Sequence, residues 1–224
     1  RGGQRFNKIP GRPLFIWLIS QSDTFTPSEL AEAEHVFVAS KTYAEELAAE
    51  GHGVSYLPQC TDRSIFFPAR MKADLATELL FVGNRRSWFK RPVVEMALAT
   101  PRELSVWGRG WDDDLPAGVQ RGSFIANSDL VHHYASANVV LNDHTPAMLH
   151  NEFLSNRSYD VLASGRPVLT EEMAGIPEDL RDGLWLYRSD TFADVVENAL
   201  AVGHPRGADL SAHVRREHSF DARA

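Results

Sequence analysis

Two acidic residues, Glu152 and Asp160, stand eight positions apart in the stretch 150–170, HNEFLSNRSYDVLASGRPVLT. If the whole interval is helical, a rise of 1.5 Å per residue separates them by about 12 Å. That distance is too long for two carboxylates acting on one glycosidic bond, so a glycoside hydrolase is disfavoured. It suits two hydrogen-bond acceptors that hold separate sugars of an extended ligand. The alternative is that Glu152 complements a helix dipole and Asp160 is a solvated helix residue.

A basic loop follows the apolar segment 79–82 (LLFV). A glycine at its start lets a ligand approach the backbone, and guanidinium groups bind phosphate oxygens well. The loop therefore predicts a diphosphate site; the alternative is a solvated loop whose arginines form surface ion pairs. The residues predicted to bind the diphosphate are Gly83, Arg85, Arg86, Lys90 and Arg91.

Polar residues also follow the apolar segment 139–142 (VVLN). Ligands of open parallel sheets bind beyond the carboxyl ends of the strands, so Asn142 and His144 are well placed to contact one. A metal site is conceivable from the histidines at 132, 133, 144 and 150. However, adjacent residues of a helix face different ways, and no H-E-x-x-H spacing is present. We predict no metal ligands in this chain.

A lone G-x-G pattern, Gly108-Arg109-Gly110, precedes Trp111. The third glycine of a dinucleotide fingerprint is absent, because position 113 is Asp. The run 112–114 (DDD) would also repel a phosphate placed beside it. The pattern therefore predicts a tight turn, with Trp111 as a packed aromatic residue.

The order of apolar and amphipathic segments predicts an α/β protein. Apolar runs at 12–19, 35–39 and 54–57 alternate with helix signals at 26–29 and 40–50, which is βαβαβ order and implies parallel strands. After an irregular stretch the order restarts and predicts a doubly wound parallel sheet. Its strands are expected at 79–82, 104–107, 119–123, 139–142, 168–170 and 184–187. Gly165 fits a helix C′ position with positive φ, and Pro167 prevents that helix from continuing.

Composition excludes several classes of function. The net charge of −7 argues against a nucleic-acid-binding surface. The single cysteine, Cys60, rules out an internal disulfide and favours a cytoplasmic location. No apolar run is long enough to span a bilayer, and residues 1–12 lack a signal-peptide core and an initiator Met. We therefore expect a chain that begins inside a longer protein. No nucleophile elbow or P-loop is present, and no cofactor is predicted.

Taken together, these segments resemble the C-terminal, donor-binding domain of GT-B glycosyltransferases, and most nearly the GT4-like group that includes the CgeB-like proteins. The resemblance is carried by LLFVGN at 79–84, LSVWGRGW at 104–111, YASANVVLNDH at 134–144 and NRSYDVLASGRPVLT at 156–170. Glu152 and Asp160 match the spacing of the E-x7-E motif, with Asp in place of the second Glu. Phe153 and Leu154 stand where the motif has glycines.

The resemblance implies a GT-B fold with a complete C-terminal and a partial N-terminal Rossmann-like domain. Residues 1–58 would end the N-terminal domain, whose earlier half is absent; 59–77 would be the linker, and 78–224 the donor domain with its closing helix. Glu152 would contact the donor sugar and Asp160 the ribose. Asn142 and His144 are predicted to contribute to the same sugar and ribose contacts.

The implied activity is metal-independent transfer of a hexose-like sugar from a nucleoside-diphosphate sugar to an unknown acceptor. In this family the diphosphate is bound by an Arg and a Lys, which correspond here to Arg85 or Arg86 and to Lys90 or Arg91. The catalytic base would lie outside this chain. Two alternatives stay open, a non-catalytic GT-B-like module that binds a nucleotide or partner, and a sugar-nucleotide epimerase.

Overall fold

A computed structural model describes residues 8–20, 24–111 and 114–224 and divides them into two compact units. Unit 1 contains the described part of 1–59 together with 144–155 and 173–177, and unit 2 contains the described part of 60–143 with 156–172 and 178–224. The predicted limits of separate domains at 58 and 78 stay a prediction. The chain start at 1–7 and the acidic pair at 112–113 lie outside the described residues.

Unit 1 contains a parallel sheet with the strand order β1-β2-β3. Its elements are β1 (Phe15–Leu18), α1 (Pro27–Ala31), β2 (His35–Val38), α2 (Lys41–Ala49), β3 (Val54–Tyr56) and α5 (Pro146–His150). Ile16, Leu18, Val36 and Val38 form the core together with Leu47 of α2. The predicted βαβαβ order of this part of the chain is therefore confirmed.

Local sequence signals account for the helix starts of unit 1. Thr26 and Glu29 form the predicted capping box, in which each side chain accepts a hydrogen bond from the other's backbone N–H. Ser40 caps α2 by accepting from the backbone of Tyr43. Helix α5 was not predicted, although Thr145 caps it and Pro146 is its first residue.

Unit 2 contains a six-stranded sheet in the order β6-β5-β4-β7-β8-β9, and every pair of neighbouring strands is parallel. The strands are β4 (Thr77–Val82), β5 (Leu104–Trp107), β6 (Gln120–Gly122), β7 (Ala137–Leu141), β8 (Val168–Glu171) and β9 (Trp185–Tyr187). The chain starts in the middle at β4, runs outward to β6, and then crosses to β7 on the other side. This order confirms the predicted doubly wound sheet.

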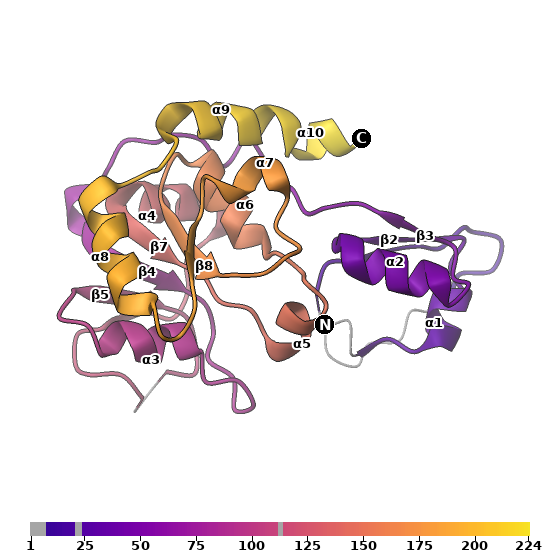
Figure 1. Ribbon diagram of the computed structural model, residues 1–224, viewed down its shortest axis with the longest axis horizontal. Coiled ribbons are helices and arrows are strands. Elements are labelled where there is room, and N and C mark those ends of the chain that lie inside the picture. Colours follow the sequence, from indigo (N-terminus) through magenta and orange to yellow (C-terminus); the bar gives the residue numbers. More distant parts are fainter. Residues whose placement is uncertain (1–7, 21–23, 112–113) are drawn as a thin grey trace. The chain divides into compact units, whose positions relative to one another are not determined.

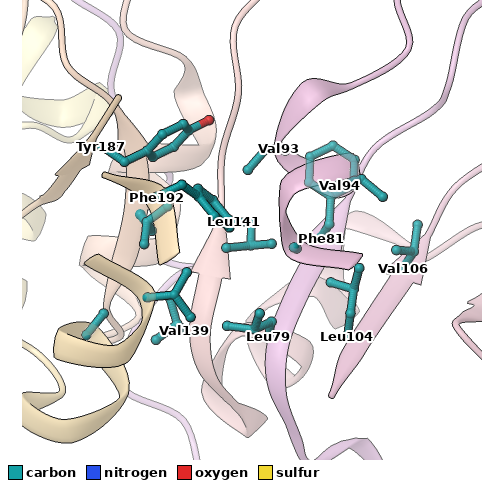
Figure 2. Close-up of a cluster of buried hydrophobic side chains, with 14 of the residues drawn as sticks. Leu79, Phe81, Val93, Val94, Leu104, Val106, Val139, Leu141, Tyr187 and Phe192 are labelled. Atoms are coloured by element: carbon teal, nitrogen blue, oxygen red, sulfur yellow. The ribbon is translucent and has the colours of Figure 1, made fainter. Parts of the chain in front are cut away.

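Helices cover both faces of the unit 2 sheet (Figure 1). Helices α3 and α8 pack on one face, where Phe81, Val106 and Leu141 are fully buried (Figure 2). Helix α4 contacts β4 and β7, and α6 contacts both α4 and α9. The helical elements are η2 (Ala73–Leu75), α3 (Pro92–Leu98), η4 (Asn127–Asp129), α4 (Leu130–Ser136), α6 (Asn156–Ala163), α7 (Glu178–Arg181), α8 (Phe192–Val202), α9 (Gly207–Glu217) and α10 (Phe220–Arg223). No helix among the described residues has the length and apolar character needed to cross a membrane.

The structure decides two points about helix α6 that the sequence left open. It begins at Asn156, so Glu152 lies outside it, and the all-helical spacing of the two acids does not apply. Its residues 158–163 are all buried, so the alternative of a solvated Asp160 is wrong. The end of the helix is as predicted, because Gly165 has a φ of 72°.

Candidate functional site

The order of the strands in unit 2 contains a switch point between β4 and β7. β4 and β7 are neighbours, and the chain leaves them toward opposite sides of the sheet. Ligands of doubly wound sheets bind outside the carboxyl ends of strands at such a point. The loop 83–91 follows β4, and Asn142 and Asp143 follow β7. The fold thus brings two of the predicted ligand-binding segments to one edge.

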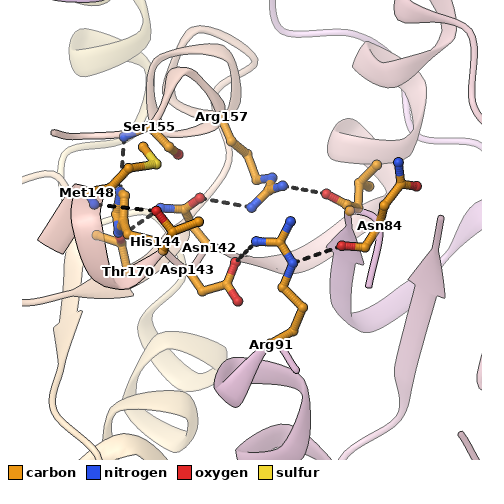
Figure 3. A network of polar contacts seen from close by, with 12 residues as sticks. Asn84, Arg91, Asn142, Asp143, His144, Met148, Ser155, Arg157 and Thr170 are labelled. Atoms are coloured by element: carbon orange, nitrogen blue, oxygen red, sulfur yellow. Dashed lines mark hydrogen bonds and ion pairs between the residues drawn. The ribbon is translucent and has the colours of Figure 1, made fainter. Parts of the chain in front are cut away.

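Arg91 is held at this edge by several contacts. Its side chain is 14% exposed, and its Nη1 donates to Oδ1 of Asp143, a fully buried side chain, over 2.8 Å. Its Nε donates to the backbone oxygen of Asn84 over 3.0 Å (Figure 3). The guanidinium lies 4.9 Å from the centre of the Phe89 ring. Arg91 adopts a left-handed backbone (φ 59°) directly before Pro92, and a following proline disfavours the right-handed helical region.

A second arginine, Arg157, shares this edge and was not among the predicted site residues. It projects from the first turn of α6. Its Nη1 donates to Oδ1 of Asn142 over 2.9 Å, and its Nη2 donates to the backbone oxygen of Val82 over 2.5 Å (Figure 3). Its guanidinium lies over the Phe81 ring at 5.1 Å, and that of Arg91 lies 5.6 Å from the same ring. A cation directly before the buried run of α6, in the segment NRSYD at 156–160, is the feature that could have indicated Arg157, but only Asp160 of this segment was predicted to bind a ligand.

Positive charge exceeds negative charge at this edge. Burial lowers the pKa of Arg91, Asp143 partly offsets this effect, and the neighbouring charges of Arg157 and Arg86 lower the pKa further. The guanidinium groups of Arg157 and Arg86 are therefore close enough to Arg91 to repel it, while Asp143 pairs with it. An anion placed beside them would relieve this repulsion. The geometry thus favours a ligand with phosphate or carboxylate groups.

The other predicted cations differ in their surroundings. Arg85 forms a two-point ion pair with Asp114, with Nε–Oδ2 at 2.9 Å and Nη2–Oδ1 at 3.1 Å. Its charge is therefore neutralised within the protein, as the surface-ion-pair alternative expects. Arg86 and Lys90 are exposed and form no ion pair within the described part of the chain. Arg86 lies 5.4 Å from the ring of Trp88, which is 60% exposed.

The loop after β5 packs directly on the loop after β4. A Cβ atom at Gly108 would lie 2.1 Å from the backbone oxygen of Gly83, and one at Gly110 would lie 2.7 Å from that of Arg85. Trp111 is 2% exposed and donates from its indole nitrogen to the backbone oxygen of Gly83 over 2.9 Å. The predictions of a tight turn and of a packed tryptophan are both confirmed.

Gly83 itself makes room for a side chain of the protein. A Cβ atom there would lie 3.0 Å from the Phe81 ring and 3.3 Å from Nη2 of Arg157. The absence of a side chain at Gly83 therefore leaves room for the guanidinium of Arg157. This role does not depend on a ligand.

Asn142 and Asp160 are buried and already hydrogen-bonded. Asn142 donates to Thr170 over 2.8 Å and accepts from Arg157, so it orients that arginine. Asp160 is 7% exposed and accepts from Thr61 over 2.8 Å and from Asn156 over 2.7 Å. Burial raises the pKa of Asp160 to about 7, against the opposing effect of these two hydrogen bonds. Their contacts with a donor stay predictions.

His144 and Glu152 belong to unit 1. Nε2 of His144 accepts from the backbone N–H of Ser155 over 3.0 Å, so the neutral ring carries its proton on Nδ1. Glu152 accepts from the hydroxyl of Thr42, and its backbone is left-handed with φ 56°. Gly175 packs against the Glu152 backbone, since a Cβ there would lie 2.3 Å from its oxygen. The contacts of His144 and Glu152 with a donor sugar stay predictions.

Solved structures of known enzymes share this architecture. Sucrose-phosphate synthase from Thermosynechococcus elongatus is 17% identical over 92% of this chain and 61% of its own, with a TM-score of 0.64. HepE from Anabaena, solved with UDP and glucose, is 13% identical over 95% and 69%, with a TM-score of 0.67. A trehalose-phosphate synthase from Burkholderia vietnamiensis is 12% identical over 94% and 65%, with a TM-score of 0.60. The fold is therefore of the GT-B type.

The family follows from the sequence itself. Residues 85–224 match the model of a family described as glycosyl transferase-like, and the chain belongs to that family. No curated protein matches the chain significantly in sequence. The chain spans less than two thirds of the length of the sucrose-phosphate synthase.

Proposed function

We propose that this chain is the donor-binding part of a GT-B glycosyltransferase of the GT4-like, CgeB-like group, which moves a sugar from a nucleoside diphosphate to an acceptor. The observation that carries the proposal is the pair of guanidinium groups, Arg91 and Arg157, held at the carboxyl ends of β4 and β7. A diphosphate carries the negative charge that would balance the two positive guanidinium groups. HepE, whose structure holds UDP and glucose, makes UDP sugars the first donors to test.

The arginines would act on the leaving group. Transfer breaks the bond between the anomeric carbon and the diphosphate oxygen, and negative charge grows on the departing nucleoside diphosphate. Cations fixed before the reaction stabilise this charge without having to reorganise. Arg91 and Arg157 are fixed by hydrogen bonds to the protein, whereas the exposed Arg86 and Lys90 can turn toward the phosphates. These cations are proposed to make a divalent metal unnecessary.

The remaining predicted residues are assigned to the sugars of the donor. Glu152 and His144 are proposed to contact the transferred sugar, and Asp160 the ribose, for which it must exchange one of its hydrogen bonds. Asn142 is proposed to act mainly by orienting Arg157. The acceptor and the catalytic base are proposed to come from outside these residues.

Titration with UDP, GDP and dTDP, followed by calorimetry, tests the proposal. We expect one nucleoside diphosphate to bind, and Arg91→Met or Arg157→Met to weaken it about 10- to 100-fold, because each removes charge-assisted hydrogen bonds. Arg121→Met is the matched control, since Arg121 forms a surface ion pair with Glu103. Binding that is equally tight in all variants, or no binding at all, would contradict the proposal.

Product analysis with the corresponding sugar donor then separates the remaining possibilities. Release or transfer of the sugar supports the transferase. Conversion of the donor to its 2-epimer supports the epimerase. Binding without any turnover by the full-length protein supports a non-catalytic module.

A further inference from the structure

Three side chains with metal-binding atoms converge near the C-terminal end of unit 2. Asp179 lies on α7, His213 on α9, and His218 directly follows α9. Oδ2 of Asp179 is 2.7 Å from Nε2 of His213 and 2.7 Å from Nε2 of His218. The three ligand atoms all lie within 4.8 Å of one another. Figure 1 shows α7 beside the helices of the chain end.

The hydrogen bonds define the protonation of this cluster. A carboxylate only accepts, so each histidine Nε2 that contacts Asp179 carries a hydrogen. Nη2 of Arg223 lies 2.8 Å from Nδ1 of His218, and arginine only donates. His218 is therefore neutral, with its single proton on Nε2.

One carboxylate oxygen of Asp179, Oδ2, accepts hydrogen bonds from both histidine rings. The cluster thus offers one carboxylate and at least one neutral imidazole. Carboxylates and neutral imidazoles are the forms that bind metals, although here a proton stands on the Nε2 atoms that would coordinate the ion.

We propose that Asp179, His213 and His218 bind a zinc ion through Oδ2 and the two Nε2 atoms. Two histidines and a carboxylate, with water as the fourth ligand, are a common tetrahedral set for zinc, and bond lengths near 2 Å place neighbouring ligand atoms about 3.3 Å apart. The carboxylate must therefore move away from each ring by about 0.6 Å. The side chain of Asp179 is 46% exposed, which leaves room for this movement and for the water.

The histidine rings are held in place by packing. The ring of His218 lies 5.7 Å from that of the buried Tyr159 and 5.6 Å from that of His213. The backbone oxygen of Asp179 accepts from Arg206 over 2.9 Å, which fixes the end of α7. Ligands that are already oriented lose less conformational entropy when the metal binds.

The contact of Arg223 with His218 disfavours metal binding. Zinc bound at the two Nε2 atoms requires the proton on each of them to leave. In His218 the single proton moves to Nδ1 through exchange with solvent, and in His213 it moves to Nδ1 or, if the ring is doubly protonated, is released to solvent. Nδ1 of His218 can then no longer accept a hydrogen bond from Arg223, which must move away. Removing the Arg223 guanidinium should therefore tighten zinc binding, which distinguishes this site from nonspecific binding to surface histidines.

A bound metal would fasten the chain end to the interior of unit 2. The backbone oxygen of His218 accepts from the N–H of Thr61 over 2.8 Å, and the Thr61 hydroxyl donates to Asp160. Asp179 and His213 are 34 residues apart, so a link between them closes a long loop. The zinc site lies outside the residues of the proposed donor site and does not depend on that function.

The test uses the full chain without a histidine tag, titrated with Zn²⁺ by calorimetry and with Co²⁺ by visible absorption. We expect one Zn²⁺ per chain and a Co²⁺ band of a four-coordinate site. His213→Ala and the isosteric Asp179→Asn should each weaken zinc binding at least tenfold, and Arg223→Met should tighten it severalfold. His150→Ala, which removes an exposed histidine elsewhere, should bind zinc as the parent chain does.

Circular dichroism of each variant establishes that it is folded before it is titrated. The proposal is overturned if the parent chain binds no Zn²⁺, or if folded His213→Ala and Asp179→Asn bind it as tightly as the parent. It is also overturned if Arg223→Met does not bind Zn²⁺ more tightly, because the protonation argument would then be wrong.

Discussion

Arg157 connects three parts of unit 2 through one side chain. Its two terminal nitrogens bond to Asn142 and to the backbone of Val82, and its planar face covers Phe81. A planar guanidinium can make all of these contacts at once, whereas a lysine ammonium is a point charge on a flexible stem. The position of the charge therefore depends on arginine in particular.

Arg157→Lys should consequently keep the positive charge but lose the hydrogen bonds that hold it in position. We expect nucleoside-diphosphate affinity to fall about tenfold and the free energy of unfolding to fall by about 1–2 kcal/mol, because one or two charge-assisted hydrogen bonds are lost. Calorimetric titration and urea unfolding measure the two effects. Arg121→Lys, at an exposed ion pair, should change both by much less. Equal effects in the two variants would contradict this role of Arg157.

Asp160 should make stability depend on pH. Its pKa is raised from 3.8 to about 7 in the folded chain, mainly by burial. As pH rises above 4, the unfolded chain loses this proton while the folded chain keeps it until about pH 7, so the folded state becomes relatively less stable. The loss should be on the order of 2–4 kcal/mol and complete above pH 8.

Urea unfolding of the parent chain and of Asp160→Asn at pH 5 and pH 8 measures this effect. The amide cannot ionise, so the variant should lose less stability than the parent between the two pH values. If both chains lose the same amount, Asp160 does not titrate in this range. The hydroxyl of Thr61 and the amide of Asn156 stay available as hydrogen-bond donors in either case.

At the level of elements, the two loops beyond β4 and β5 depend on each other. Gly108 has a φ of 147° and no space for a Cβ atom beside the backbone of Gly83. Asn84 extends the contact by accepting from the backbone N–H of Arg109 over 2.8 Å. The loop that positions the cations is thus supported by a glycine on a neighbouring loop.

Gly108→Ala should destabilise the chain by about 3 kcal/mol or more, since backbone strain and a clash with backbone atoms add together. Gly118→Ala is the control, because Gly118 also has positive φ (82°) but nothing within 4 Å of its Cβ position. It should cost only about 1 kcal/mol. Equal losses in urea unfolding would show that strain alone, and not the close approach, matters at Gly108.

Local signals predicted most elements, because caps, glycines and apolar runs act over a few residues. The capping box at Thr26 and the C′ glycine at Gly165 are examples. The conditional helical spacing of Glu152 and Asp160 does not apply, because α6 begins only at Asn156. Phe153, directly after Glu152, is instead buried in the core of unit 1, where it packs on Tyr43. Short α7, with four residues, has too little periodicity to be recognised.

The site itself was predictable as a location but not as a set of contacts. Residues that follow apolar strands mark the sheet edge, and Arg91 was found in this way. The pairing of Arg85 with Asp114 joins residues 29 apart, and that of Arg157 with Val82 joins residues 75 apart. Such contacts depend on the strand order, which no local pattern contains. The same holds for Asp179 and His218, 39 residues apart.

At the level of the whole molecule, the proposed donor contacts lie in two compact units. Arg91 and Arg157 belong to unit 2, and His144 and Glu152 belong to unit 1. The residues proposed to contact the diphosphate and those proposed to contact the sugar therefore lie in different stretches of the chain, 83–91 with α6 and 144–155. The two parts of the ligand can be added separately, which makes this division testable.

Hydrogen exchange measured with UDP and with UDP-glucose provides the test. UDP should slow exchange in 83–91 and at the start of α6, since the phosphates bind Arg91 and Arg157. UDP-glucose should additionally slow exchange in 144–155, because Glu152 and His144 bind the sugar. Glu152→Gln should lose only this second effect, while the buried strand β8 serves as an internal control that changes in neither case. Slowed exchange in 144–155 with UDP alone, or with neither ligand, would remove the sugar-binding role of Glu152 and His144.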